Sequence, residues 1–131
     1  MNQPSLTHIH LTIPGQPEFV GVVRLAAAGI AHRLRLSMED SDDLKLAVTE
    51  ACGHLLGLAK TEISVDWEIE DERLTITVKG VGSPQPASPA AQWSEIGLFL
   101  IHALMDDVAQ FESDGHAGIR MVKTIHRTDD E

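Results

Sequence analysis

Residues 43–56 read DLKLAVTEACGHLL, and the apolar side chains of this stretch recur at the spacing of a helix. Intervals of three and four place one apolar stripe along a single helical face, here made by Leu44, Ala47, Val48, Ala51, Cys52, Leu55 and Leu56. Upstream, Ser37 stands three residues before Asp40, which resembles a capping box with its acidic group in the first turn. We therefore predict a helix that begins after Ser37 and buries one face.

Two segments precede this helix. Residues 7–13 alternate between apolar and polar and end at Pro14, which predicts a half-buried strand with Ile9, Leu11 and Ile13 on one face. From Pro17 the period changes to that of an amphipathic helix, with apolar positions at Val20, Val23, Ala27, Ile30 and Leu34. The sequence thus predicts a strand followed by two consecutive helices.

Two hairpins and a third helix complete the pattern. Residues 63–69 and 74–78 alternate on both sides of a polar turn, as do 108–112 and 119–125. Between them, residues 80–89 read GVGSPQPASP and predict a long loop. A third helix is expected from the apolar stripe Ile96, Phe99, Leu100, Ala103 and Leu104. This order predicts an α+β two-layer sandwich, with helices on one face of a mixed, mainly antiparallel sheet.

Length and charge restrict the function. The 131 residues predict a single domain, with a core from about 6 to 126 and a flexible tail at 127–131. The net charge of -10 and the 4% aromatic content argue against binding nucleic acid or an anionic membrane. With no apolar run near the roughly 20 residues of a membrane span, we expect a cytoplasmic protein. The single cysteine, Cys52, lies on an apolar stripe and is expected to be a buried hydrophobe.

Three segments carry a resemblance to a known family: 17–25 (PEFVGVVRL), 43–52 (DLKLAVTEAC) and 97–108 (GLFLIHALMDDV). They resemble the anti-sigma factors that double as serine kinases (RsbW-like), members of the GHKL ATPase superfamily, and the likeness runs in order from about His8 to Ile125. It implies a GHKL-type sandwich and a homodimer that binds a sigma factor and an anti-sigma antagonist in partner switching. It leaves open whether the pathway is a stress response or sporulation.

The resemblance also implies site residues. A family glutamate on the second helix, thought to be the base for the substrate serine, matches Glu50. The family asparagine one turn later, which holds magnesium, is replaced by His54. Residues four apart share a helical face, but an imidazole suits zinc, copper or nickel better than magnesium, which prefers oxygen ligands. His54 is thus a doubtful metal ligand, and a packed or surface histidine is the simpler interpretation.

Two further nucleotide motifs are altered. The family aspartate that accepts a hydrogen bond from adenine is replaced by Gly80, whereas Gly82 of the same motif remains. At the start of the third helix the family Gly-x-Gly, which meets phosphate, reads Glu95-Ile96-Gly97, so that a carboxylate replaces the first glycine. Losing the adenine contact and a metal ligand is expected to cost about 3 to 6 kcal/mol. A micromolar nucleotide site would become roughly millimolar.

Three functions remain open. The first is an anti-sigma factor that acts by protein binding, with no cofactor and with weakened or lost kinase activity; by resemblance Arg24 would contact the partner, although a solvated arginine is equally consistent. The second is an active serine kinase that uses ATP and Mg²⁺, with Glu50 as base. The third is a domain that only dimerises. A metalloenzyme is disfavoured because the histidines are dispersed.

Overall fold

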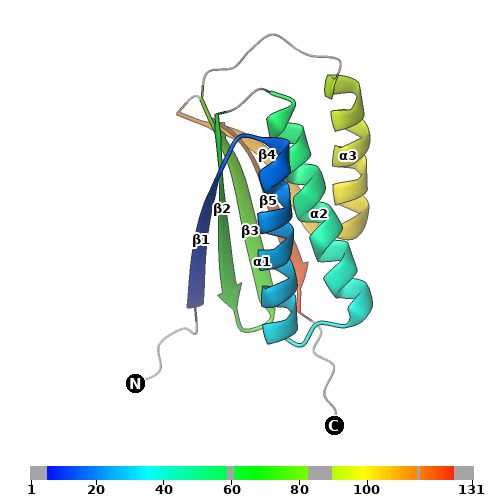
Figure 1. Ribbon diagram of the computed structural model, residues 1–131. Helices are drawn as coiled ribbons and strands as arrows, with labels where there is room; N and C mark the ends of the chain where they lie inside the picture. Colours follow the sequence, from blue (N-terminus) through cyan, green and yellow to red (C-terminus); the bar gives the residue numbers. More distant parts are fainter. Residues whose placement is uncertain (1–5, 59–60, 83–89, 115, 126–131) are drawn as a thin grey trace.

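The structure, a computed structural model, describes residues 6–58, 61–82, 90–114 and 116–125, with only the backbone for 90–94. Along the chain (Figure 1) the elements are β1 (Leu6–Pro14), the short 3-10 helix η1 (Pro17–Phe19), α1 (Val20–Arg33), α2 (Met38–Leu56), β2 (Glu62–Glu70), β3 (Arg73–Val81), α3 (Ala90–Leu104), β4 (Asp107–Ser113) and β5 (His116–Thr124). The strands form one sheet, and the three longer helices cover one of its faces. The expected α+β sandwich is therefore confirmed.

The sheet has the strand order β1-β2-β3-β5-β4, and all of its described pairings are antiparallel. It therefore lacks, among the described residues, the parallel pair that a mixed sheet would contain. Since β5 is antiparallel to both of its neighbours, β3 and β4 run in the same direction and α3 connects them. The last strand thus lies between the two strands that this helix joins, which is a split βαβ arrangement.

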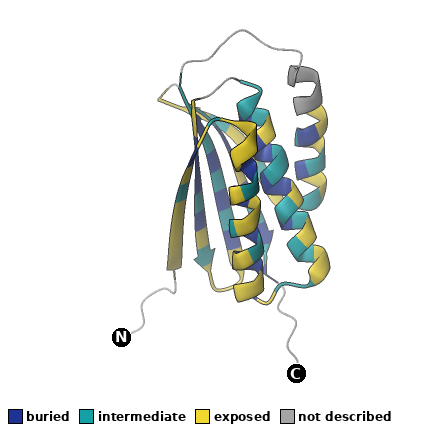
Figure 2. Ribbon diagram, in the orientation of Figure 1, coloured by how far each residue is buried: buried dark blue, intermediate teal, exposed yellow. Residues whose placement is uncertain are grey.

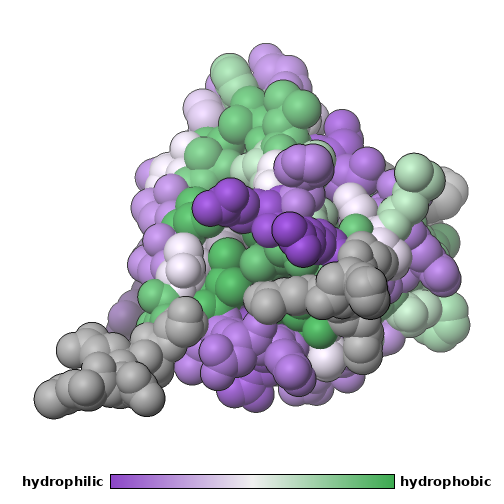
Figure 3. Space-filling view, turned by 90° about the horizontal axis from the view of Figure 1, so that it is seen from below, coloured by the Kyte–Doolittle hydropathy of each residue, from purple (hydrophilic) through white to green (hydrophobic). Residues whose placement is uncertain are grey.

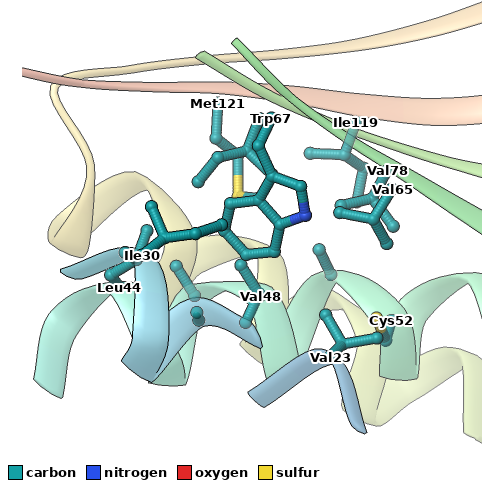
Figure 4. Close-up of a cluster of buried hydrophobic side chains, with 14 of the residues drawn as sticks. Val23, Ile30, Leu44, Val48, Cys52, Val65, Trp67, Val78, Ile119 and Met121 are labelled. Atoms are coloured by element: carbon teal, nitrogen blue, oxygen red, sulfur yellow. The ribbon is translucent and has the colours of Figure 1, made fainter. Parts of the chain in front are cut away.

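The core lies between the helices and the sheet (Figure 2), and the stripes predicted for α1 and α2 are confirmed. All five apolar residues predicted for α1 are buried, as are six of the seven predicted for α2, with Leu56 partly buried. Ser37 caps α2 as predicted, because its side chain accepts a hydrogen bond of 3.1 Å from the Asp40 amide. Trp67 reaches from β2 into the centre of the core, toward Ile30 and Val48 (Figure 4).

Two expectations are corrected by the structure. In α3 the predicted apolar face is wrong: Ile96 and Phe99 are 53% and 75% exposed, whereas Ile101 and Met105 are buried. The helix is apolar on nearly every side, so periodicity does not identify its inner face. The loop predicted to begin at Gly80 begins later, because β3 continues through Val81. The loop residues 83–89 and the expected tail at 127–131 lie outside the described residues.

Strand β1 buries less than its alternation predicts. Ile13 is 3% exposed, but Ile9 remains 37% exposed because β1 is an edge strand and α1 covers it only in part.

None of the helices in the described ranges is long and apolar enough to cross a membrane. The same ranges contain no cluster of three or more histidine, cysteine or acidic side chains able to hold a metal ion.

Candidate functional site

Glu50 and Gly97 lie against each other where α2 packs on the middle of α3. A Cβ added to Gly97 would lie only 2.7 Å from Glu50 Oε1. The glycine therefore allows the backbone of α3 to approach the carboxylate closely. Glu50 is half-buried, so one of the predicted site residues from α2 meets one from α3, and the carboxylate retains the access that a proton acceptor needs.

His54 lies one turn after Glu50 on the same side of α2 and is half-buried. Burial lowers the pKa of its imidazole below the usual 6.5, because desolvation penalises the charged form. At neutral pH the side chain is therefore neutral, with one nitrogen donor and one nitrogen acceptor. It does not provide the hard oxygen ligand that magnesium prefers.

Gly80 is buried within β3, where it pairs with Ile63 of β2 and Ala117 of β5. Buried residues alternate along this strand at Leu74, Ile76, Val78 and Gly80, so position 80 faces the helix layer. The family resemblance implies an adenine-binding aspartate at this position. Gly80 thus stands under the helices with no side chain to accept a hydrogen bond.

Gly82 has a structural reason to be glycine. Its φ of +125° is one that side chains rarely adopt, and a Cβ there would lie 2.7 Å from Thr61 Oγ1 and 2.9 Å from Thr61 N. The Thr61 amide in turn donates to Val81 O at 2.8 Å, and Thr61 O accepts from the Gly15 amide at 2.8 Å. Thr61 therefore joins the ends of β1 and β3. The backbone at this turn explains the glycine by itself, and no bound ligand is needed to account for it.

The remaining predicted residues, Glu95 and Arg24, lie apart from this group. The expectation that Glu95 and Gly97 open the third helix is wrong, because α3 begins at Ala90 and both residues lie inside it. Glu95 is exposed and, two residues before buried Gly97, points to another side of α3. Arg24 is exposed on α1, and its Nε donates to Thr49 Oγ1 of α2 at 3.1 Å. Thr49 Oγ1 donates in turn to Lys45 O at 2.7 Å. Arg24 therefore links the two helices and is more than a freely solvated arginine.

A large open cavity of about 1270 Å³ lies elsewhere, between α1 and the β1–β2 part of the sheet. Its walls include Ile9, Ile30 and Ile69, and Arg33, Asp71 and Glu72 add charge. Figure 3, which views the molecule from below, shows apolar surface beside strongly hydrophilic residues. None of the predicted site residues lines this cavity. The cavity is therefore separate from the candidate site on α2 and α3.

Sequence reasoning missed Lys123, the buried cation at the lower end of the sandwich. Its ammonium donates to Leu104 O at the end of α3 at 3.0 Å, and it lies 3.6 Å from an Asp40 oxygen and 3.9 Å from an Asp43 oxygen of α2. Lys123 is only 8% exposed, so it joins β5, α2 and α3 from within. The sequence signal for this role was a lysine at an inward-facing position of β5, where the other inward-facing residues are apolar.

Cys52 fits its predicted role as a packed side chain. It is fully buried, and burial raises the pKa of its thiol to about 12, with a smaller opposing effect from the Arg24 charge. A thiol with this pKa remains protonated at physiological pH, and the thiolate is the reactive form. Cys52 is therefore an inert part of the core.

Comparison with known proteins agrees with this architecture. A family model described as the histidine kinase-like ATPase domain matches residues 13–123. A serine-protein kinase RsbW from Bacillus licheniformis is 35% identical, over 92% of this chain and 87% of that protein. Proteins of the same name from Bacillus velezensis and Bacillus subtilis are 32% and 30% identical, over 93% and 89% of this chain and 88% and 84% of theirs.

The antiparallel sheet, its helix layer and the match over most of the chain define the class: the chain belongs to the histidine kinase-like ATPase family. Within that class, the relatives described above are RsbW serine-protein kinases. The GHKL-type fold expected from the three matching segments is thereby confirmed.

Proposed function

We propose that this protein is an anti-sigma regulatory factor that works by binding a sigma factor, an anti-sigma antagonist or both, and that its ATP binding and kinase activity are weakened or lost. The observation that carries the proposal is Gly80. It occupies a buried, inward-facing position of β3 where the family places its adenine-binding carboxylate. The scaffold around it remains complete, because the core and the helix cap are intact.

His54 supports the same conclusion. The nucleotide of this family arrives with magnesium, and the residue matched to the magnesium-binding asparagine is a half-buried imidazole whose pKa is lowered by burial. Nitrogen is a poor substitute for an oxygen ligand of this hard ion. The residues present therefore do not match a magnesium–triphosphate complex.

An active serine kinase is the second candidate, and the close contact between Glu50 and Gly97 favours it. The contact keeps the residue matched to the base beside the Gly97 backbone in the middle of α3. On that alternative, ATP and Mg²⁺ would be cofactors and Glu50 would accept the proton of the substrate serine. This candidate requires the missing adenine contact to be supplied by another group.

The proposed partners follow from charge and from the family. A net charge of -10 favours a basic surface on the sigma factor or antagonist and accelerates association at low salt. We include Arg24 among the contacts, because it is exposed and held in position by Thr49. A homodimer formed by the whole 131-residue domain, acting in the cytoplasm, completes the proposal.

Calorimetric titration with ATP and with ADP, each with and without Mg²⁺, tests the proposal directly. We expect no heat of binding and no thermal stabilisation below millimolar nucleotide. Tight, magnesium-dependent binding that raises the melting temperature would overturn the weakened site and support the kinase. Titration with candidate sigma factors at two salt concentrations then tests the binding role, with weaker binding expected at high salt.

A further inference from the structure

Helix α3 is apolar beyond what its packing requires. In its residues 95–104, whose side chains are described, Glu95 is the only acidic residue and no lysine or arginine is present. Gly97, Ile101 and Met105, spaced four apart, form the line that packs on the core. A helix that is apolar on nearly all sides is normally covered on more than one of them. The outer side of α3 is therefore the unusual one.

That outer side presents large apolar groups to solvent. Phe99 is 75% exposed and Ile96 is 53% exposed, and exposed Ala103 follows at the next helical spacing. We call Ile96, Phe99 and Ala103 the α3 outer face. Clustered apolar exposure of this kind marks interaction surfaces.

Carboxylates lie at one end of the α3 outer face. Lys123 contacts both the end of α3, at Leu104, and the start of α2, at Asp40 and Asp43, so these two helix ends are adjacent. Glu39 and Asp42 of α2 and Asp107 after α3 are exposed there. Lys123 itself is buried against its two carboxylates. The apolar face therefore runs into acidic surface.

We propose that the α3 outer face is a docking site for a basic amphipathic helix of the protein partner. The charge of the surface favours this partner. The apolar side of the partner helix would cover Phe99 and Ile96, and the cations of the partner helix would lie against Glu39, Asp42 and Asp107. From residue 96 to residue 104 the face is about 12 Å long, so two to four turns of a partner helix span it and the acidic end. This inference rests on the proposed partner-binding function and specifies its surface.

A second copy of the chain is a poorer occupant. In a two-fold pairing the face meets itself with its two ends exchanged, which would set the acidic end of each copy against exposed Glu95 of the other. Like charges at an interface oppose association. The charge pattern therefore favours a basic partner over self-association through this face.

The test uses the full chain and a fluorescent amphipathic peptide of leucine and lysine as probe, with anisotropy as the readout. We expect the peptide to bind wild-type protein and Phe99→Gln to weaken binding at least tenfold, whereas a matched peptide with glutamate for lysine does not bind. Leu25→Gln is the matched control, because Leu25 is also 75% exposed but lies on α1. We expect it to change binding less than twofold. Melting curves check that both variants fold.

Equal effects of the two variants, or no binding by the lysine peptide, would overturn the docking site. So would a dimer that Phe99→Gln converts to monomer in sedimentation, because the face would then be a self-interface. A sigma factor identified by titration separates the two proposals. If wild type and Phe99→Gln bind it equally, the docking site fails and the proposed function stands, whereas failure of every sigma factor and antagonist to bind wild type counts against the function.

Discussion

The two ends of the α2–α3 pair differ in how their polar groups are used. At the lower end, Lys123 satisfies the last carbonyl of α3 and two carboxylates of α2, and Ser37 caps α2. Toward the upper end, Glu50 packs against bare Gly97 backbone in the middle of α3, and Gly80 supplies no side chain beneath the helices. The lower end holds groups that stabilise the scaffold, whereas the upper end departs from the family pattern at residues matched to nucleotide binding, which is the basis of the proposed loss of ATP binding. Scaffold and site are thus separable in this fold.

Restoring the family residues at the upper end is the strongest way to break this comparison. His54→Asn combined with Gly80→Asp supplies one oxygen ligand and one adenine acceptor, together about 3 to 6 kcal/mol of binding. We expect ATP affinity in the presence of Mg²⁺ to rise roughly 10²- to 10⁴-fold. Calorimetry and nucleotide-dependent thermal shift measure it.

The double variant needs its own control, because an aspartate at buried position 80 could destabilise the fold. Circular dichroism melting of the variant without nucleotide establishes that it is folded. His102→Asn, on the exposed surface of α3, is the matched control and should leave nucleotide affinity unchanged. A folded double variant with no gain in affinity would show that the upper end lacks more than these two side chains.

Removing the cation from the lower end should have the next largest effect. Lys123→Met leaves Asp40, Asp43 and Leu104 O without their shared partner, and we expect a loss of about 2 kcal/mol in the free energy of unfolding. Urea denaturation measures the change. Lys45→Met is the control, because the Lys45–Asp42 pair is exposed at 3.3 Å and should contribute less than about 0.5 kcal/mol. Similar losses in both variants would contradict the central role of Lys123.

The Glu50–Gly97 contact can be measured as a double-mutant cycle. Alanine is better than glycine in a helix interior by about 1 kcal/mol, but its Cβ at position 97 would meet Glu50 Oε1. We therefore expect Gly97→Ala to be nearly neutral in wild type and to stabilise the Glu50→Ala variant by about 1 kcal/mol. Gly53→Ala, with nothing near its added Cβ, is the control and should stabilise both backgrounds equally. Additive effects at 50 and 97 would mean that the contact is absent in solution.

The lowered pKa of His54 predicts a smaller, pH-dependent effect on the free energy of unfolding. Because burial lowers its pKa below 6.5, the unfolded chain binds more protons than the folded one just below that pH. Stability from this group is therefore complete above about pH 6.5 and decreases as the pH falls through the lowered value. Urea denaturation at pH 5 and pH 8 should show a smaller difference in His54→Gln than in wild type. An unchanged difference would place the proton-linked group elsewhere.

Elements with one clear periodicity were predictable from the sequence, and those whose faces depend on neighbours were not. The stripe of α2 and its Ser37 cap follow from local spacing, because the buried residues of that helix recur at intervals of three and four. In α3 apolar residues surround the axis, so choosing Ile101 over Phe99 as the buried one depends on the approach of α2 and the sheet. Antiparallel pairing throughout the sheet likewise depends on where β5 inserts.

The candidate site shows the same limit. Glu50, His54 and Gly97 could be chosen from motif spacing, and the structure brings Glu50 and Gly97 into contact. Gly82 was expected as the retained glycine of the adenine motif, but its backbone conformation and its contact with Thr61 are features that no local motif contains. Lys123 was missed because a lysine in an alternating strand reads as solvent-exposed until its three partners are known.

The position of β5 has a consequence for the order in which the protein can fold during synthesis. β5 follows β4 in the chain, yet it lies between β3 and β4 and pairs with both. Until it emerges from the ribosome, β3 has an open edge and β4 has no strand to join, although α1, α2 and the β2–β3 hairpin are already complete. Open strand edges invite pairing with other chains. The nascent chain is therefore most exposed to misassembly just before β5 is released, and insertion of β5 joins β3 to β4 in a single late step.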